Sequence, residues 1–300
     1  MKRYQPDGSK SGRLRFKPNL IKTMEGFMKR FMLLFLSIVL VFGVCVMPGT
    51  ANAEESKPIG VTVGLDFWNN YFWRGVDFFG SGVGVFFPWV YYGVGDTGLS
   101  FMYLGQYAAE TFGDSTRMND PDQGKGLVAY EGAHFNAAYK YVVKDVITLG
   151  VSGWYYWFYN CDDKLGYDWS WYEGTVSATV TAVPLNPTLS YTYDYFVDKK
   201  VTTTGEQGKN HYVKLSVGHS IELVKGSSLG LGLSAAYFQW ESMDKKGVSD
   251  IVASTKLATS AGAVSFSGGL NFAYVPDSEF NGDGVNRYRW WANFGANYSF

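Results

Sequence analysis

Hydrophobic and polar residues alternate with a period of two along most of the chain after residue 60. In the stretch WYEGTVSATVTAV, for example, Val176, Ala178 and Val180 are separated by Ser177 and Thr179. The same alternation recurs in TLSYTYDYF, in VSFSGGLNFAY and in the final YRWWANFGANYSF. Because successive side chains of a β-strand point to opposite faces, this period predicts strands, whereas a helix would show a period of about 3.6. The pattern therefore predicts an all-β protein.

The segments that separate these strands alternate in length. GDTG, KD, PLNP, KGSS and SAGA are tight turns rich in residues that favour turns. Longer polar loops lie between them at 110–126, 160–170, 198–209, 241–249 and 276–286, and the first connection, around VDFFGSG, is shorter and apolar. This predicts about twelve antiparallel strands, with about ten or fourteen left open because 241–262 is the weakest stretch. The predicted strands are 60–74, 83–94, 99–109, 127–143, 146–159, 171–183, 188–197, 210–223, 229–240, 250–259, 264–275 and 287–300.

One face of each predicted strand is apolar and the other is small or polar. A soluble sandwich alternates in this way, but so does a membrane barrel, whose apolar side chains face lipid and whose polar ones face a wet interior. Strands of about 9–14 residues match the tilted span of a bilayer, and Tyr and Trp near strand ends match an interfacial belt. We therefore predict a transmembrane antiparallel β-barrel. Pairing of the first strand with the last would close it and leave no edge in the bilayer.

The N-terminal region has the parts of a secretory signal. From Met28, Lys29 and Arg30 form a basic start, 31–46 is an apolar core, and Ala51 and Ala53 have the spacing of a cleavage site. The apolar run is shorter than the roughly 20 residues of a transmembrane helix. We expect a leader or upstream-start extension at 1–27, a signal peptide at 28–53 cleaved after Ala53, and a barrel domain at 54–300. An exported barrel is expected in the outer membrane of a Gram-negative bacterium.

Cleavage after Ala53 would change the charge of the chain. It removes nine of 26 Lys and Arg residues and two of 27 Asp and Glu residues, which leaves 17 against 25 and a net charge of −8. An acidic chain disfavours nucleic acid as a partner. Cys161 would be the only cysteine left, so an intrachain disulfide is excluded.

The end of the chain resembles the insertion signal of bacterial outer-membrane proteins. Asn293, Gly295, Tyr298 and Phe300 supply a polar residue, a glycine two positions later and two aromatics at alternate positions, the second of them terminal. The resemblance implies that the barrel-assembly machinery is a partner. Deletion of Phe300 is then expected to stall membrane insertion.

A second resemblance concerns the first strand. The segment FWNNYFWRGVDFFGSGVGVFF contains an aromatic-x-x-Arg-Gly signature, in which Arg74 and Gly75 follow Tyr71, Phe72 and Trp73. It resembles the opening of the TorF-type family of bacterial outer-membrane porins. The resemblance implies a channel, and it implies no particular substrate.

The lumen face is where the sequence predicts function. Acidic and basic side chains facing one another would form a constriction that selects solutes by charge. The alternative is a structural ion-pair network that fills a barrel too narrow to conduct. By alternation, the candidate pore-lining residues are Asp66, Arg74, His134, Lys140, Glu173, Asp194, Lys214 and Arg289, and Trp68, Asn136, Trp154, Tyr156, Trp171, Glu222 and Lys256 are placed on the same face.

Four inward aromatics suggest a second use of the lumen. Trp68, Trp154, Tyr156 and Trp171 could stack on sugars or nucleosides and guide them along a track. The alternative is that these rings belong to an interfacial belt or to a plug. A strand register that slips by one residue would reverse the assignment.

The sequence indicates no enzyme. His219 and Ser220 are adjacent in a predicted strand, so they point to opposite faces and cannot act as base and nucleophile. Acidic clusters at 119–126, 161–168 and 276–284 do not match a complete calcium-binding loop. We therefore assign no catalytic, metal or cofactor-binding residue.

The sequence thus predicts an outer-membrane porin for passive diffusion of small polar solutes. A mild cation preference is expected from the net acidity and from the acidic loops. The expected partners are outer-membrane lipids, lipopolysaccharide, the barrel-assembly machinery and small polar solutes. Two alternatives stay open, a non-conducting barrel that acts as an adhesin or surface structural protein and, less favoured, a lipid-modifying barrel enzyme.

Overall fold

The computed structural model describes residues 60–77, 84–108, 131–158, 170–197, 209–241, 244–277, 280 and 287–300. The predicted leader and signal peptide, and most of the loops 110–126, 160–170 and 198–209, lie outside the described residues. The strands of the wall are β1 (Val61–Trp68), β4 (Val85–Gly93), β5 (Leu99–Ala108), β6 (Glu131–Val143), β7 (Ile147–Trp157), β8 (Trp171–Val180), β9 (Thr188–Phe196), β10 (Asn210–Val224), β11 (Ser227–Trp240), β12 (Lys245–Ala261), β13 (Val264–Tyr274) and β14 (Tyr288–Ser299).

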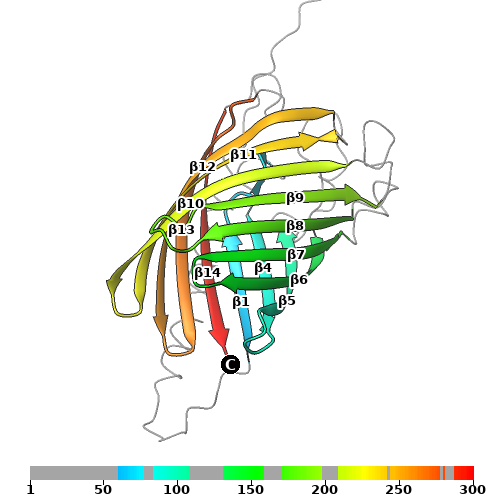
Figure 1. Ribbon diagram of the computed structural model, residues 1–300. Coiled ribbons are helices and arrows are strands. Elements are labelled where there is room, and N and C mark those ends of the chain that lie inside the picture. The colour runs from blue at the N-terminus through cyan, green and yellow to red at the C-terminus, as the bar shows by residue number, and fades with distance from the viewer. Residues whose placement is uncertain are drawn as a thin grey trace, which may run out of the picture. The chain divides into compact units, whose positions relative to one another are not determined.

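These twelve strands close into one antiparallel barrel, in which each strand pairs with its neighbours in the chain (Figure 1). The seam joins β1 to β14, with Val63 opposite Tyr298 and Leu65 opposite Ala296. The predicted fold class, strand number and closure are therefore confirmed. Closure satisfies the backbone hydrogen bonds of both terminal strands, so neither has a free edge.

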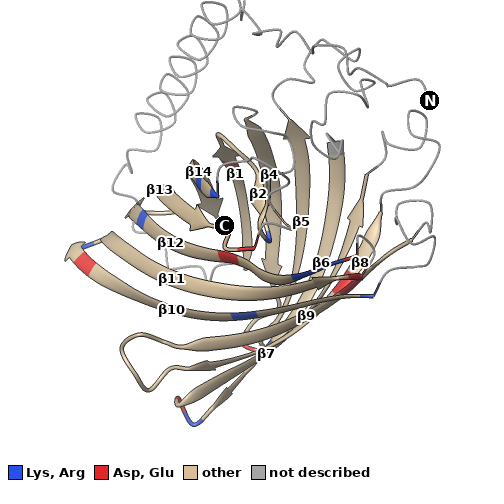
Figure 2. Ribbon diagram, turned by 90° about the horizontal axis from the view of Figure 1, so that it is seen from above, with Lys and Arg blue, Asp and Glu red and all other residues tan. Residues whose placement is uncertain are grey.

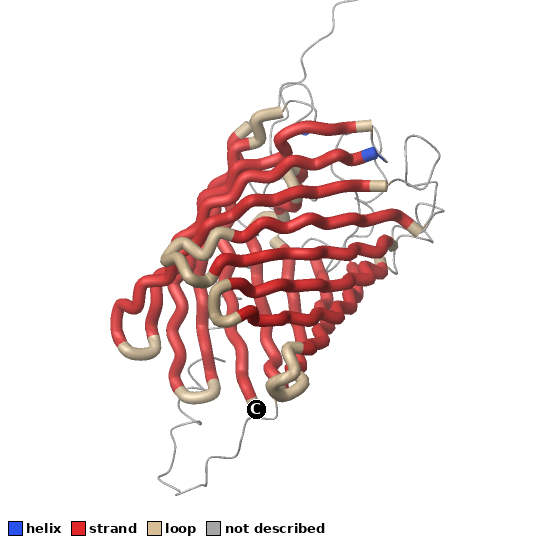
Figure 3. The backbone as a smooth tube through the Cα atoms, viewed as in Figure 1, coloured by secondary structure: helices blue, strands red, loops and turns tan. Residues whose placement is uncertain are grey.

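Tight turns join the strands at one end of the barrel, where the sequence placed them (Figure 3). Lys144 and Asp145, with φ angles of 50° and 57°, form the turn between β6 and β7, and Lys225 and Gly226 form the turn between β10 and β11. The longer connections all leave from the opposite end, which we call the loop end, in contrast to the turn end. The described residues contain no helix long and apolar enough to cross a membrane.

The prediction of a single strand over 60–74 was wrong. β1 ends at Trp68, and two short strands, β2 (Phe72–Trp73) and β3 (Val76–Asp77), form a separate hairpin. Asn69 ends the pairing with β14, because its backbone N–H donates to the carbonyl of Ala292 and its side-chain oxygen accepts from the N–H of Ala292. The aromatic residues continue past this point, so alternation alone did not reveal where the chain leaves the wall.

The connection between β11 and β12 was also predicted too long. β12 begins at Lys245, whereas the sequence suggested a loop to residue 249 and a strand over 250–259. A register shift opposite Ala236 and Tyr237 lets Gly247 and its polar neighbours continue the ladder with β11. Backbone pairing does not depend on apolar side chains, and so a polar stretch was misread as a loop.

The outer face of the wall is apolar. Leu215, Leu270 and Trp290 expose 56%, 62% and 65% of their surface, and the inward residues that alternate with them are less exposed. Only scattered charged residues lie on the ring of strands in the view along the barrel (Figure 2). The predicted apolar and polar faces are therefore those of the structure.

The inner face changes character along the barrel. On β11 the inward residues at the turn end are Ser228, Gly230 and Gly232, whereas at the loop end they are the buried Phe238 and Trp240. β7 shows the same change, from small residues to Trp154 and Tyr156. The hydrophobic core of the protein thus lies inside the barrel at its loop end, where Phe72, Phe238, Trp240, Phe280 and Trp291 pack together.

Candidate functional site

The hairpin of β2 and β3 packs inside the barrel. Trp73 pairs with Val76, so Arg74 and Gly75 form a two-residue turn. Their φ angles of 49° and 88° are both positive, as a type I′ turn requires. A Cβ atom at Gly75 would lie 2.5 Å from the carbonyl oxygen of Ser249 on β12, so only glycine lets the turn approach the wall this closely.

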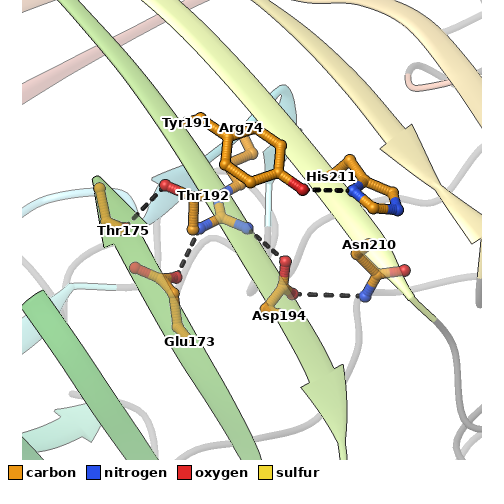
Figure 4. Close-up of polar contacts among 8 residues, drawn as sticks. All are labelled: Arg74, Glu173, Thr175, Tyr191, Thr192, Asp194, Asn210 and His211. Atoms are coloured by element: carbon orange, nitrogen blue, oxygen red, sulfur yellow. Dashed lines mark hydrogen bonds and ion pairs between the residues drawn. The ribbon is translucent and has the colours of Figure 1, made fainter. Parts of the chain in front are cut away.

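The turn presents the Arg74 guanidinium to two carboxylates of the wall (Figure 4). Nη1 donates to Asp194 Oδ1 at 3.0 Å, and Nη2 donates to Glu173 Oε2 at 2.5 Å. Glu173 on β8 and Asp194 on β9 are direct register partners. The side chains of Arg74, Glu173 and Asp194 expose 7%, 9% and 2% of their surface, so these ion pairs are buried. Two adjacent buried carboxylates would repel each other without a cation between them.

Aromatic rings surround the same guanidinium. The Cζ atom of Arg74 lies 4.2 Å from the ring centre of Trp73, 4.7 Å from that of Tyr212 and 5.5 Å from that of Phe238. Each distance is within the range of a cation–π interaction. Burial lowers the pKa of Arg74, but the Asp194 and Glu173 carboxylates raise it by more, so its pKa lies above the usual value. Arg74 is therefore a permanent buried cation.

Neighbouring polar groups hold the wall side of this site in place. Asn210 Nδ2 donates to Asp194 Oδ2 at 3.3 Å. The Tyr212 hydroxyl is hydrogen-bonded to Asp250, which also accepts from Ser249 Oγ at 2.7 Å. These contacts join β9, β10 and β12, so the positions of the acids and of Tyr212 are determined by the wall itself.

The predicted aromatic track is part of this packing. Tyr156 stacks on Trp171 with ring centres 4.6 Å apart and on Trp154 at 5.5 Å. Trp171 contacts Trp73 of the hairpin at 5.9 Å, and Trp68 contacts Phe87 at 5.4 Å. These rings stack on one another and on the hairpin, which is the arrangement expected of a plug.

The other predicted pore-lining residues do not join Arg74, Glu173 and Asp194. His134 is 1% exposed and its Nε2 lies 3.2 Å from Gln106 Oε1. Asp66 accepts from Trp89 Nε1 at 3.2 Å, and Lys214 lies on the inward face of β10 near Asp250. Lys140 is exposed near the turn end of β6, and Arg289 lies at the loop end of β14 with Nη1 donating to the Tyr288 carbonyl.

The residues of the predicted insertion signal lie on both faces of β14. Asn293 and Gly295 face inward, and Asn293 Oδ1 accepts from Asn271 Nδ2 at 3.0 Å. Tyr298 and Phe300 face outward with exposures of 37% and 49%. The spacing thus separates a polar inner pair from an aromatic outer pair, and its role in insertion stays a prediction.

The sequence analysis missed several residues of the site, namely Gly75, Asn210, Tyr212, Phe238, Ser249 and Asp250. A signal for one of them was present. The inward series of β11 changes from small residues to aromatic ones at Phe238. Such a change marks the level at which the lumen is filled. Nothing in the local sequence predicts that Gly75 lies close to Ser249.

No protein-family model and no curated protein sequence matches this chain. Among solved structures, the chain is similar to the NanC porin, with 9% identity over 80% of this chain and 100% of that chain and a TM-score of 0.48. For the KdgM porin in complex with disordered oligogalacturonate, the identity is 9% over 80% and 98% of the two chains and the TM-score is 0.44. For an outer membrane channel from Pseudomonas putida F1, the identity is 13% over 84% and 100%, with a TM-score of 0.46. Such low values transfer neither family nor function, so the resemblance to TorF-type porins stays a prediction.

Proposed function

We propose that this protein is an outer-membrane channel for small polar solutes, narrowed at one end by the hairpin that carries Arg74. The supporting features are an apolar outer wall, a small and polar inner wall, and a built constriction.

The outer wall has the composition of a lipid-facing surface. Aliphatic side chains such as Val151, Val176 and Leu215 are each at least half exposed, at 50%, 52% and 56%. Towards the loop end, outward tyrosines stack in a row, with ring centres 4.7 Å apart between Tyr155 and Tyr172 and 5.6 Å apart between Tyr172 and Tyr195. An apolar band bordered by aromatic residues is typical of a barrel in a bilayer and is costly in water.

The main support for a channel is the lining of the inner wall at the turn end. Small polar residues and glycines predominate on the lumen face there on β1 and on β7 to β14, whereas β4 places the larger Trp89 and Tyr91 on its inward face. In a closed barrel of this size, short side chains leave space that only water can fill. A hydrated lumen inside an apolar wall is the geometry of a solute path. Among the residues of this lining are Ser152, Ser177, Ser190, Ser216, Gly230, Ser254, Ser267 and Asn297.

The hairpin is the proposed constriction. It packs against aromatic residues at the loop end, next to three carboxylates, Glu173, Asp194 and Asp250, and two cationic side chains, Arg74 and Lys214. This excess of acidic groups supports the mild cation preference that the sequence suggested. The acidic loop clusters, which would add to it, lie mainly outside the described residues.

A non-conducting surface barrel is the second candidate. The observation that favours it is the dense packing of the hairpin and its aromatic neighbours at the loop end. For a lipid-modifying enzyme we find no support in the described residues that the sequence singled out, since His219 and Ser220 point to opposite faces of β10.

The test is single-channel conductance of refolded residues 54–300 in a planar bilayer under a salt gradient. We expect ohmic current steps with a reversal potential shifted towards that of the cation. A variant in which two glycines replace residues 72–77 should give larger steps, because the constriction is gone. If both proteins are folded and inserted but neither conducts, the channel proposal is overturned and the surface-barrel candidate is favoured.

A further inference from the structure

The wall that receives Arg74 has the features of a binding site for a planar organic cation. We propose that Glu173, Asp194, Tyr212 and Phe238 form a guanidinium-binding site on the channel wall. Arg74 occupies this site in the structure, and solutes that carry a guanidinium group compete with it. This inference rests on the proposed channel and names the class of solute that the constriction recognises.

The site belongs to the wall and not to the hairpin. Glu173 and Asp194 are register partners on adjacent strands, and Asn210 donates to Asp194 from the next strand. Tyr212 is held by Asp250, and Phe238 stacks on Trp240 with ring centres 5.4 Å apart. The carboxylates and two of the three aromatic faces therefore stay in place if the hairpin withdraws.

The geometry selects guanidinium over a simple cation. Each carboxylate accepts from a different terminal nitrogen of the same guanidinium, Asp194 from Nη1 and Glu173 from Nη2. A planar fork of N–H groups matches two acceptors at once, and its faces stack on aromatic rings, whereas a sodium ion or a compact ammonium does neither. The site thus recognises both the charge and the shape of the group.

Arginine is not a residue that this type of turn favours. Arg74 has a φ angle of 49°, a region that residues with a Cβ atom avoid. Asn followed by Gly is the pair that type I′ turns favour, so local turn preference does not explain an arginine here. The ion pair and the ring contacts explain it, and a soluble guanidinium could form the same contacts with the wall.

The experiment uses Arg74→Asn, which vacates the site and gives the turn its preferred Asn-Gly pair. Refolded Arg74→Asn protein in a planar bilayer is exposed to methylguanidinium or to methylurea, which has nearly the same shape and no charge. We expect methylguanidinium to block the current at a concentration at least about tenfold lower than methylurea does. Adding Glu173→Gln and Asp194→Asn to this variant should abolish the difference.

A second readout does not need conduction. Methylguanidinium at low millimolar concentration should raise the melting temperature of Arg74→Asn protein in detergent, and methylurea should not, because only a ligand of the folded site stabilises it. The control Arg287→Ala removes an exposed arginine next to β14 and should behave as the natural protein in both assays.

The outcomes separate the two proposals. If methylguanidinium and methylurea block the current equally, and neither shifts the melting temperature selectively, the guanidinium-site proposal is overturned and the channel proposal stands. Folded protein that never conducts overturns the channel, and the melting shift then decides the site by itself. Selective block that survives removal of both carboxylates also overturns the assignment of the site to Glu173 and Asp194.

Discussion

At the scale of single residues, the turn between β2 and β3 shows how the hairpin is positioned. Arg74 adopts a left-handed conformation that costs an L-residue about 1–2 kcal/mol. Its buried contacts with Asp194 and Glu173 hold it there, because loss of Arg74 would leave two uncompensated buried carboxylates, and breaking a buried ion pair typically costs about 3–5 kcal/mol. Gly75 contributes in another way, because it allows the chain to pass against the Ser249 carbonyl.

Gly75 leads to a prediction at this scale. In Gly75→Ala, the new Cβ would overlap Ser249 O and the φ of 88° would be strained, so the hairpin must shift away from β12. We expect a loss of about 1–3 kcal/mol in unfolding free energy, measured by denaturant titration of the refolded barrel. Gly262→Ala is the control, since its φ of 62° is also positive and its Cβ would meet nothing within 4 Å. Equal losses in the two variants would show that strain alone, and not contact with the wall, is responsible.

At the scale of elements, each wall strand has two chemically distinct faces and an inner face that changes along its length. β11 carries outward leucines, small inward residues at the turn end and inward aromatics at the loop end. β7 repeats this order, from small inward residues to Trp154 and Tyr156, so on these strands the inward side chains are smaller at the turn end than at the loop end. Because the number of strands sets the diameter of a closed barrel, the size of the inward side chains decides how much of the lumen they fill.

Two glycines test this account of the strands. Gly230 faces the lumen on β11, where a Cβ would have its nearest neighbour at 3.6 Å, and Gly174 faces outward on β8 with nothing within 4 Å. Gly230→Trp should lower the single-channel conductance by about half or more, because it narrows the hydrated lumen. Gly174→Trp should leave the conductance unchanged. Equal effects of the two substitutions would mean that the turn-end lumen does not limit the current.

At the scale of the whole molecule, the barrel reverses the usual distribution of apolar and polar residues of a soluble protein. Its largest apolar surface faces outward, and its buried polar network and core lie inside at the loop end. Such an arrangement is stable only when the surroundings of the wall are apolar. Stability should therefore depend on which face receives a charge.

Val176 and Ser177 are neighbours on β8 that point to opposite sides. Val176→Arg places a charge in the lipid and should lower the free energy of unfolding in vesicles by about 2–4 kcal/mol. Ser177→Arg places the same charge in the wet lumen and should change it by at most about 0.5 kcal/mol. Folding titrations in lipid vesicles measure both. A similar loss in the two variants would argue against a membrane-facing outer wall.

The alternation of side chains predicted the fold class and the inward or outward face of the wall residues that it was applied to, and the turn residues predicted about twelve strands and the positions of the tight turns. Both patterns were sufficient because these properties depend on neighbours within a few residues. Inward placement of Glu173 and Asp194 followed from the same period. Arg74 was also placed inside, but for the wrong reason, since it lies on a hairpin that packs in the lumen and not on a wall strand.

Only the tertiary structure decided what these inward residues do. Arg74 meets Glu173 and Asp194 across 99 and 120 residues of chain, and no local pattern encodes a contact of that range. Whether the acids and bases line an open constriction or pair with each other depended on where the segment after β1 packs. That position follows from contacts with residues far away in the chain. Asn69, just after β1, bonds to Ala292 of β14, and Gly75 lies close to Ser249 of β12. Arg74 in turn lies over the rings of Tyr212 and Phe238. Local periodicity determines which way a side chain points, and the closed barrel determines what it meets.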